Sequence, residues 1–220
     1  MDWDSVEIVN ADCMSVFPTM ADNSVDFTLT DIPYDEVHQT SNGLRELDKN
    51  DADTLTFPLN DFLEQVYRVT ANSCCIFCGW EQFSTICSFF RDKKGTFRPL
   101  VWRKTNPSPM NGQHTYLSGL ELAVWFKKRG AKTFNAFCKT ALFQYPNGKS
   151  KVHPTEKNLD LFVELVADNT DPGQTVFDPC MGSGTSGVAA VIQGRRFKGV
   201  ELNPKFFEIA DDRIMTTPHL

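Results

Sequence analysis

Hydrophobic and polar positions along the chain follow two different periods. Apolar residues alternate with polar ones at residues 6–11 and 25–30, as in a strand, whereas residues 57–70 place Phe62, Leu63 and Val66 on one helix face. The order strand, helix, strand, helix favours a doubly wound α/β sheet over an all-β or helix-bundle fold. The expected strands are residues 6–11, 25–30, 73–79, 100–104, 121–127, 176–177 and 196–202, and the expected helices are residues 15–20, 57–70, 81–90, 155–170 and 186–193, with a last helix after Asn203.

The strand at residues 25–30 runs into Asp31-Ile32-Pro33-Tyr34, a carboxylate, a rigid proline and an aromatic ring. In an open α/β sheet, ligands bind beyond the carboxyl ends of the strands, so this tetrapeptide is a candidate site. The same residue types also occur in ordinary surface turns, in which Asp and Pro set the backbone. Residues 35–56 are polar and lack a sustained period, which predicts a mobile loop beside the site.

A glycine-bearing turn at residues 178–185 (DPCMGSGT) is the second candidate site. It joins two predicted strands and a helix of small residues into a βαβ unit. Gly182 and Gly184 permit positive φ and a close approach of ligand to backbone, and Glu201 follows at about 20 residues, where a carboxylate accepts hydrogen bonds from a ribose. The Gly-Lys-Ser/Thr ending of a phosphate loop is absent, so a nucleoside without phosphates is expected rather than ATP or NAD.

Charge is distributed unevenly, and this changes the expected partner. The chain has 220 residues and a net charge of −6, but residues 91–151 hold 13 Lys plus Arg against only Asp92 and Glu121, a local balance of +11. Aromatic residues are interleaved with these cations, a pattern typical of a surface that binds nucleic-acid phosphates; a solvated basic face is the alternative. Residues 130–151 have no clear period and are expected to be a short inserted recognition segment in a single domain.

Cysteine usage and the amino terminus indicate an intracellular protein. The seven cysteines are an odd number, and the first residues carry no secretion signal, so reduced thiols and a cytoplasmic location are expected. No apolar run reaches membrane-spanning length. Cys74, Cys75 and Cys78 lie in a predicted buried strand and lack a second ligand pair, so no metal site is expected.

Together the motifs resemble those of S-adenosylmethionine-dependent DNA amino-methyltransferases. Asp31-Ile32-Pro33-Tyr34 resembles their DPPY catalytic motif, and residues 177–186 (FDPCMGSGTS) resemble their cofactor motif. The catalytic motif comes first, the basic segment next, and the HPTEK sequence and glycine turn last, an order similar to the β group. The resemblance spans nearly the whole chain and implies a circularly permuted, mostly parallel, seven-stranded Rossmann-like sheet.

The resemblance also implies roles for the catalytic tetrapeptide. The Asp31 carboxylate and the Ile32 carbonyl would accept the two protons of an exocyclic amino group, Pro33 would fix the turn, and Tyr34 would stack on a base flipped out of DNA. Ile32 replaces the proline usual in the family, and Asp rather than Ser at position 31 favours adenine N6 over cytosine N4. Cytosine N4 transfer, or a DNA-binding module with weak or lost turnover, are the alternatives.

The remaining matching positions are expected to hold the cofactor or the DNA. A homodimer is one way in which so short a recognition segment could be supplemented. Thr155 is also the expected cap of its helix, and Lys157 is expected near the methionine carboxylate. The cofactor positions are Asp12, Cys13, Asp31, Thr155, Lys157, Phe177, Asp178, Pro179, Gly182, Ser183, Gly184, Thr185, Glu201 and Asn203. The DNA positions are Arg103, Lys104, Asn106, His114, Lys132 and Lys139.

Overall fold

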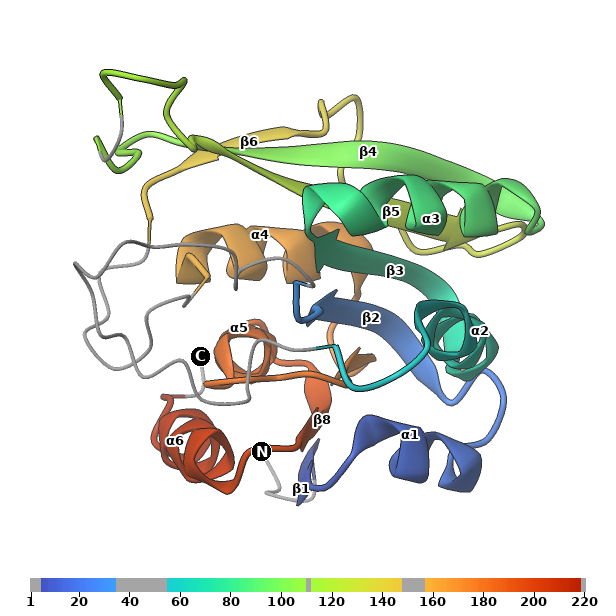
Figure 1. The fold of residues 1–220 in the computed structure, drawn as a ribbon. Helices are drawn as coiled ribbons and strands as arrows, with labels where there is room; N and C mark the ends of the chain where they lie inside the picture. The colour runs from blue at the N-terminus through green and yellow to red at the C-terminus, as the bar shows by residue number, and fades with distance from the viewer. Residues whose placement is uncertain (1–4, 35–54, 110–111, 148–156, 219–220) are drawn as a thin grey trace.

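A computed structural model describes residues 5–34, 55–109, 112–147 and 157–218. These residues form an eight-stranded sheet in the order β1-β8-β7-β2-β3-β5-β4-β6, covered by helices on both faces (Figure 1). The strands are β1 (Val6–Asn10), β2 (Val25–Asp31), β3 (Thr70–Cys78), β4 (Gly95–Lys104), β5 (Leu120–Lys128), β6 (Leu142–Tyr145), β7 (Thr175–Asp178) and β8 (Arg196–Glu201); the helices are α1 (Cys13–Val16), the 3-10 turn η2 (Phe17–Thr19), α2 (Leu59–Val69), α3 (Trp80–Arg91), α4 (Leu159–Asn169), α5 (Thr185–Ile192) and α6 (Pro204–Met215).

The sheet is parallel from β1 to β3, and β5 runs antiparallel to both of its neighbours. The predicted doubly wound, mostly parallel fold is therefore confirmed, with one strand more than the seven expected. The extra strand is β6, which pairs parallel to β4 at the sheet's edge. Its four residues bury only Phe143 fully, so the sequence carried too little hydrophobic signal to predict it.

Two hydrophobic clusters fill the space on either face of the sheet. Side chains of β3 alternate between them, with Cys75 and Phe77 in the cluster under α4, α5 and α6, and Cys74 and Ile76 in the cluster under α1, α2 and α3. The cysteines of β3 are thus core residues. Within the described ranges, no cluster of three His, Cys, Asp or Glu side chains could hold a metal ion, and no helix is long and apolar enough to cross a membrane.

The first residues of β4 and α4 lie at least four positions from the sequence-based expectation. Strand β4 begins at Gly95 because its first half pairs with β5 although most of its side chains are exposed. Helix α4 is capped by Asn158, whose side chain accepts a hydrogen bond from Leu161 N at 3.0 Å. The prediction that Thr155 caps this helix is therefore wrong, because the helix begins later; Thr155 itself lies outside the described residues, as does the expected mobile loop except for Leu55 and Thr56.

Candidate active site

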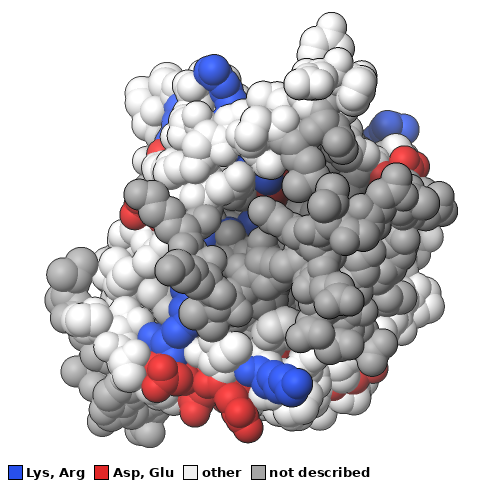
Figure 2. All heavy atoms as spheres, turned by 60° about the vertical axis from the view of Figure 1, so that its left-hand side comes forward, with Lys and Arg blue, Asp and Glu red and all other residues white. Residues whose placement is uncertain are grey.

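Four charged residues end their strands at one edge of the sheet, which we call the catalytic edge. Asp31, Lys104, Asp178 and Glu201 are the last residues of β2, β4, β7 and β8, and the antiparallel β5 begins at the same edge, placing Glu121 there. This is the edge at which open α/β sheets bind ligands. Figure 2 shows this face of the molecule, with Lys and Arg atoms visible near its centre.

Asp31 lies in a network of charged side chains at this edge. The Tyr34 hydroxyl donates to Asp31 Oδ1 at 2.9 Å, and Lys157 Nζ lies 2.8 Å from Asp31 Oδ2. The same Nζ lies 2.8 Å from Glu121 Oε2, and Lys104 Nζ lies 2.6 Å from Glu121 Oε1. The Lys157 side chain is only 8% exposed, so it is a bridge between two carboxylates rather than a solvated surface cation.

Burial and pairing set the protonation of these groups. Burial raises the pKa of Asp31, and Lys157 opposes this shift. Burial alone would lower the pKa of Lys157, but Asp31, Tyr34 and Glu121 outweigh it and hold that pKa well above its ordinary value. Burial would raise the pKa of Glu121, but Lys157 and Lys104 reverse the shift and lower it. Lys157 and Glu121 are therefore charged at neutral pH.

The backbone of the tetrapeptide is tied to β3 and α3. Ile32 N donates to Phe77 O at 3.2 Å, and the Pro33 carbonyl accepts from Gln82 Nε2 at 2.7 Å. A proline at position 32 could not donate the first of these hydrogen bonds. The Ile32 side chain is 1% exposed in the core, so isoleucine replaces the rigidity of a proline ring with packing and a backbone hydrogen bond.

The glycine turn lies at the same edge, between β7 and α5. Gly182 and Gly184 have φ of +53° and +81°, as the sequence predicts. Gly182 N donates to Glu201 Oε2 and Asn203 N donates to Glu201 Oε1, both at 2.8 Å, so backbone donors fix both oxygens of this carboxylate. Among the described residues, apart from its chain neighbours, no atom lies within 4 Å of the position a Gly182 Cβ would occupy, which leaves open space beside the turn.

Other predicted cofactor residues support the turn from below. Asp178 is 3% exposed and accepts from Cys180 N at 3.0 Å and from Ser186 Oγ at 2.5 Å; burial raises its pKa to about 7. Phe177 is buried in the core against the edge of the Phe17 ring, and Pro179 is buried as well. Thr185, the first residue of α5, is also buried, and Arg213 donates to Ser183 Oγ at 2.9 Å.

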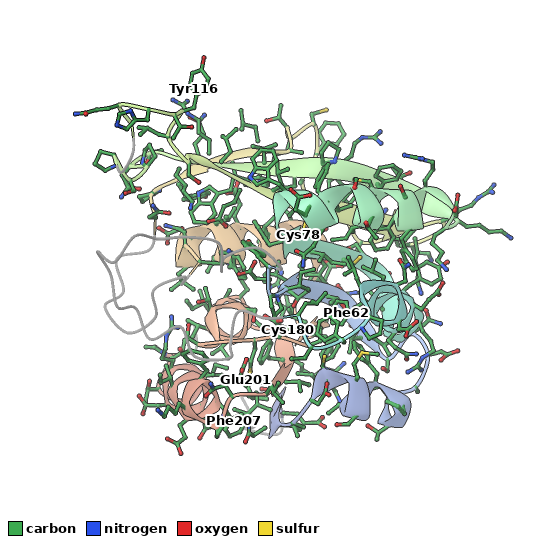
Figure 3. The ribbon with its side chains drawn as sticks, viewed as in Figure 1. Phe62, Cys78, Tyr116, Cys180, Glu201 and Phe207 are labelled. Carbon is green, nitrogen blue, oxygen red and sulfur yellow. The ribbon has the colours of Figure 1, made fainter. Side chains whose placement is uncertain are left out.

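Asp12 and Cys13 reach this part of the edge from β1. Ala11 N donates to Glu201 O at 3.0 Å, which places the next two residues beside β8. Asp12 Oδ1 caps α1 by accepting from Met14 N at 2.9 Å, and a hydrogen bond with the Cys13 thiol raises the pKa of the Cys180 thiol; both cysteines are free. Asn203 caps α6 by accepting from Lys205 N. Cys180 and Glu201 are both labelled in Figure 3.

The predicted DNA residues divide between two edges of the sheet. At the catalytic edge lie Arg103 and Lys104, the last two residues of β4, followed along the chain by Asn106 and His114. Lys104 forms an ion pair with Glu121, and Arg103 donates to Gln144 Oε1 at 2.9 Å. Asn106 Oδ1 accepts from Asn147 N at 2.6 Å, and His114 is exposed.

Glu121 is a site residue that was not predicted from the sequence. The signal that could have indicated it is a lone carboxylate at the start of an apolar strand within a basic block.

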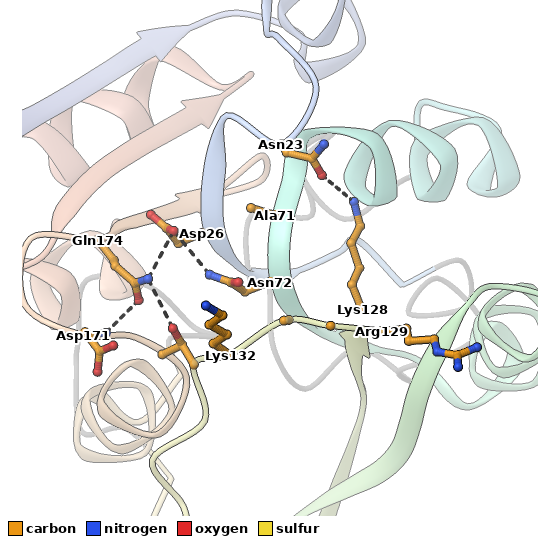
Figure 4. A pocket seen from close by; sticks show the side chains of 12 residues that line it. Asn23, Asp26, Ala71, Asn72, Lys128, Arg129, Lys132, Asp171 and Gln174 are labelled. Atoms are coloured by element: carbon orange, nitrogen blue, oxygen red, sulfur yellow. Dashed lines mark hydrogen bonds between the residues drawn. The ribbon is translucent and has the colours of Figure 1, made fainter.

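Lys132 and Lys139 lie elsewhere. Lys132 lines a cleft of about 760 Å³ at the opposite edge, where β2 and β3 begin (Figure 4). Lys139 forms ion pairs with Glu164 and Asp168 of α4, each at 2.5 Å. That Lys132 and Lys139 contact DNA stays a prediction. The cleft is lined by Asn23, Asp26, Ala71, Asn72, Lys128, Arg129, Gly130, Ala131, Lys132, Thr133, Asp171 and Gln174.

A family model described as DNA methylase, of the N6/N4 group, matches residues 25–212. The chain belongs to this DNA methylase family. It is 29% identical over 132 residues to the Type II methyltransferase M2.DpnII of Streptococcus pneumoniae, an alignment that covers 52% of this chain and 49% of that protein. It is 23% identical over 244 residues to the Type II methyltransferase M.HinfI of Haemophilus influenzae, covering 94% of this chain and 67% of that protein.

Solved structures of DNA methyltransferases resemble this DNA methylase over almost its whole length. The M1.HpyAVI–SAM complex superposes with a TM-score of 0.74 at 27% identity, covering 95% of this chain and 99% of that one. The cytosine-N4-specific PvuII DNA methyltransferase gives a TM-score of 0.72 at 14% identity, covering 95% and 88%, a likeness that shows the fold alone. The chain spans about half the length of M2.DpnII.

Proposed function

We propose that this DNA methylase transfers a methyl group from S-adenosylmethionine to the N6 amino group of adenine in DNA. The observation that carries the proposal is the position of Asp31: its carboxylate ends β2 at the same edge as the glycine turn, with Pro33 and Tyr34 following it. An acceptor for the amine and a nucleoside-binding turn at one edge are the two parts that this reaction needs.

The amine must be made nucleophilic, because the lone pair of an aromatic amino group is delocalised into the ring. The Asp31 carboxylate and the Ile32 carbonyl accept the two amino hydrogens, which localises the lone pair on nitrogen and directs it toward the methyl group at the cofactor site. Each Asp31 oxygen accepts one hydrogen bond from Tyr34 or Lys157 and keeps lone-pair capacity for the amine. Tyr34 stacks on the extruded base.

The glycine turn fits the nucleoside part of S-adenosylmethionine. The open space beside Gly182 admits a ligand against the backbone, and Glu201, whose orientation is fixed by Gly182 N and Asn203 N, accepts hydrogen bonds from ribose hydroxyls. When bound, the cofactor supplies a methyl group activated by its positive sulfonium. In this proposal Asp12 and Cys13 lie at the adenine end of the site, and Lys157, Ser183 and Thr185 lie at the methionine end; Thr155, which the sequence also assigns to the methionine end, lies outside the described residues.

DNA binds across the catalytic edge, and the segment between β4 and β5 is the described part of the chain best placed to contact it. Residues 105–119 leave β4 beside Lys104 and return to β5 beside Glu121, contain no Asp or Glu, and expose Tyr116 almost completely (99%), with its side chain extending away from the molecule (Figure 3). By contrast, the described start of the expected recognition segment packs on α4, where Asn135 N donates to Asp168 O at 2.7 Å. A homodimer stays a prediction.

Incubation with tritiated S-adenosylmethionine and mixed-sequence DNA tests the proposal. Wild type should label the DNA, and Asp31→Ala should reduce labelling by about 100-fold or more, the usual scale for losing one preorganised polar contact to the reacting group. Asp212→Ala, which removes an exposed carboxylate of α6, is the matched control and should label like wild type. Equal labelling by wild type and Asp31→Ala would remove the basis of the proposal. Label recovered as N4-methylcytosine would show that the target base is cytosine rather than adenine.

A further inference from the structure

We propose that Glu121 is a positioning residue for methyl transfer: through Lys157 it holds the Asp31 carboxylate in the orientation that accepts the target amine. This inference rests on the proposed function and adds to it a residue outside the catalytic tetrapeptide and the glycine turn. Glu121 does not bond to Asp31 itself; the two carboxylates share one ammonium group, with Lys157 Nζ at 2.8 Å from each.

The contacts form one chain of alternating charge, Lys104–Glu121–Lys157–Asp31. Lys104 Nζ lies 2.6 Å from Glu121 Oε1, and Lys157 Nζ contacts the other oxygen, Oε2. The side chains of Lys104, Glu121 and Lys157 are 16%, 18% and 8% exposed, whereas that of Asp31 is 27% exposed. The chain therefore begins in a closed environment and reaches solvent at the carboxylate that must meet the substrate.

Glu121 is held more rigidly than the residues it orients. It is the second residue of β5 and pairs with Trp102 of β4, and the following Leu122 pairs with Cys78 of β3, so strands hold it from both sides. Lys157, by contrast, precedes α4 and has a long side chain with many rotamers. Lys157 Nζ donates to the Tyr34 hydroxyl at 3.1 Å, and its contact with Glu121 ties it to β5, so that together with Asp31 these partners give the ammonium group a single position. That position sets the direction of Asp31 Oδ2.

Stability alone gives a poor reason for this cluster. Burying charges costs several kcal/mol of solvation per ion, and apolar residues of similar volume often stabilise a fold as well or better. Fixing a carboxylate at the substrate edge, however, favours charged partners, because contacts to charged groups are shorter and stronger than contacts to neutral groups. The placement of the cluster at the end of β2, and its opening at Asp31, fit the second purpose.

Kinetics should separate Glu121 from a residue that only stabilises the fold. In Glu121→Gln the side chain keeps its shape but loses its charge, so Lys157 keeps one strong partner and Asp31 loses its fixed direction. We expect kcat to fall by about 10- to 100-fold, the scale of a misplaced reacting group, with KM for DNA and cofactor within about 3-fold of wild type. Glu121→Asp, which retains the charge, should recover part of kcat.

The pH profile gives a second readout with a sign. Glu121 raises the pKa of Asp31 by repulsion and Lys157 lowers it by attraction, and the reaction needs the ionised carboxylate. The acid limb of kcat should therefore move to lower pH in Glu121→Gln and to higher pH in Lys157→Met. Among the described residues, the titratable groups that face Asp31 are Tyr34 from the following turn, Lys157 before α4, Glu121 from β5, Cys78 from β3 and Asp178 from β7.

The experiment measures kcat, both KM values and the pH profile for full-length wild type and for these variants. Glu164→Gln is the matched control, because Glu164 is also ion-paired to a lysine but lies on α4 away from Asp31. A fall in kcat for Glu121→Gln but not Glu164→Gln, with opposite shifts of the acid limb, supports the inference. If kcat of Glu121→Gln equals that of wild type, or if the acid limbs of Glu121→Gln and Lys157→Met move in the same direction, the inference is overturned while the proposed function stands. An inactive wild type instead rejects the proposed function.

Lys104→Met covers the case in which Glu121→Gln does not fold. This variant frees Glu121 Oε1 and loosens the chain from its far end without touching Asp31 or Lys157. We expect a smaller fall in kcat, about 3- to 10-fold, at unchanged KM for the cofactor. If kcat in Lys104→Met equals that of wild type while Glu121→Gln is unfolded, Glu121 is a structural residue and the inference is wrong.

Discussion

Asp178 is a buried carboxyl whose ionisation should cost folding energy, and replacing it by asparagine should stabilise the protein at alkaline pH. Burial raises the pKa of this group from its ordinary value of 3.8 to about 7. A carboxyl with a raised pKa in the folded state contributes stability below pH 3.8 and loses that contribution as pH rises through 7. Asparagine keeps an acceptor for Cys180 N and can donate to Ser186 Oγ, so both local contacts survive.

The size of the effect follows from the same shift. Each tenfold change in proton affinity is worth ~1.4 kcal/mol, so the rise from 3.8 to about 7 corresponds to at most ~4 kcal/mol at pH 8. For a chain of this length, 1 kcal/mol moves Tm by roughly 2–4 °C. Asp178→Asn should therefore raise Tm at pH 8 by several degrees, and by much less at pH 5.

Thermal unfolding followed by circular dichroism at pH 5, 6.5 and 8 measures this difference. Asp212→Asn, at an exposed position, is the control and should show the same small difference from wild type at each pH. The reasoning about burial is refuted if Asp178→Asn is destabilised equally at all three values, since the carboxylate would then be stabilising whether or not it is charged.

Two further substitutions test other parts of the account. Gly184→Ala should lower the free energy of unfolding measured in urea by about 1–3 kcal/mol, because φ at this position is +81° and the new Cβ would lie 2.9 Å from Ala210 Cβ. Gly173→Ala, with φ of +80° and open space around its Cβ, should lower it less. Equal losses would show that the contact with α6 is unimportant. Tyr116→Ala should weaken DNA binding by about 5-fold or more at unchanged Tm, as measured by fluorescence anisotropy at fixed salt. Phe137→Ala, which removes another highly exposed ring on the segment beside α4, should leave the affinity for DNA unchanged. If Tyr116→Ala binds DNA as tightly as wild type, Tyr116 is not part of the interface.

Much of the fold could be predicted from the sequence because the period of the apolar residues survives in most elements. Helix α2 buries the Phe62, Leu63 and Val66 face that its spacing indicates. Prediction failed where backbone pairing rather than side-chain burial makes the strand, as in the exposed first half of β4 and in β6. Hydrogen bonds between backbones leave little trace in the residue types of an edge strand.

The site was predictable where a residue type is tied to a local backbone feature. Gly182 and Gly184 have the positive φ that their turn requires, and Asp31 and Glu201 stand at strand ends. Lys157 was recognised from its motif, but its partners were not, because Asp31 and Glu121 come from strands distant in the sequence. Contacts that depend on strand order become visible only in the folded chain.

Nucleoside analysis of methylated DNA tests the central claim most directly. DNA incubated with the wild-type protein and S-adenosylmethionine is digested to nucleosides and analysed by mass spectrometry, beside a parallel digest from Asp31→Ala. The account predicts N6-methyldeoxyadenosine in the wild-type digest and its near absence in the variant. The same amount of methylated adenine from both proteins, or none from wild type, would contradict it.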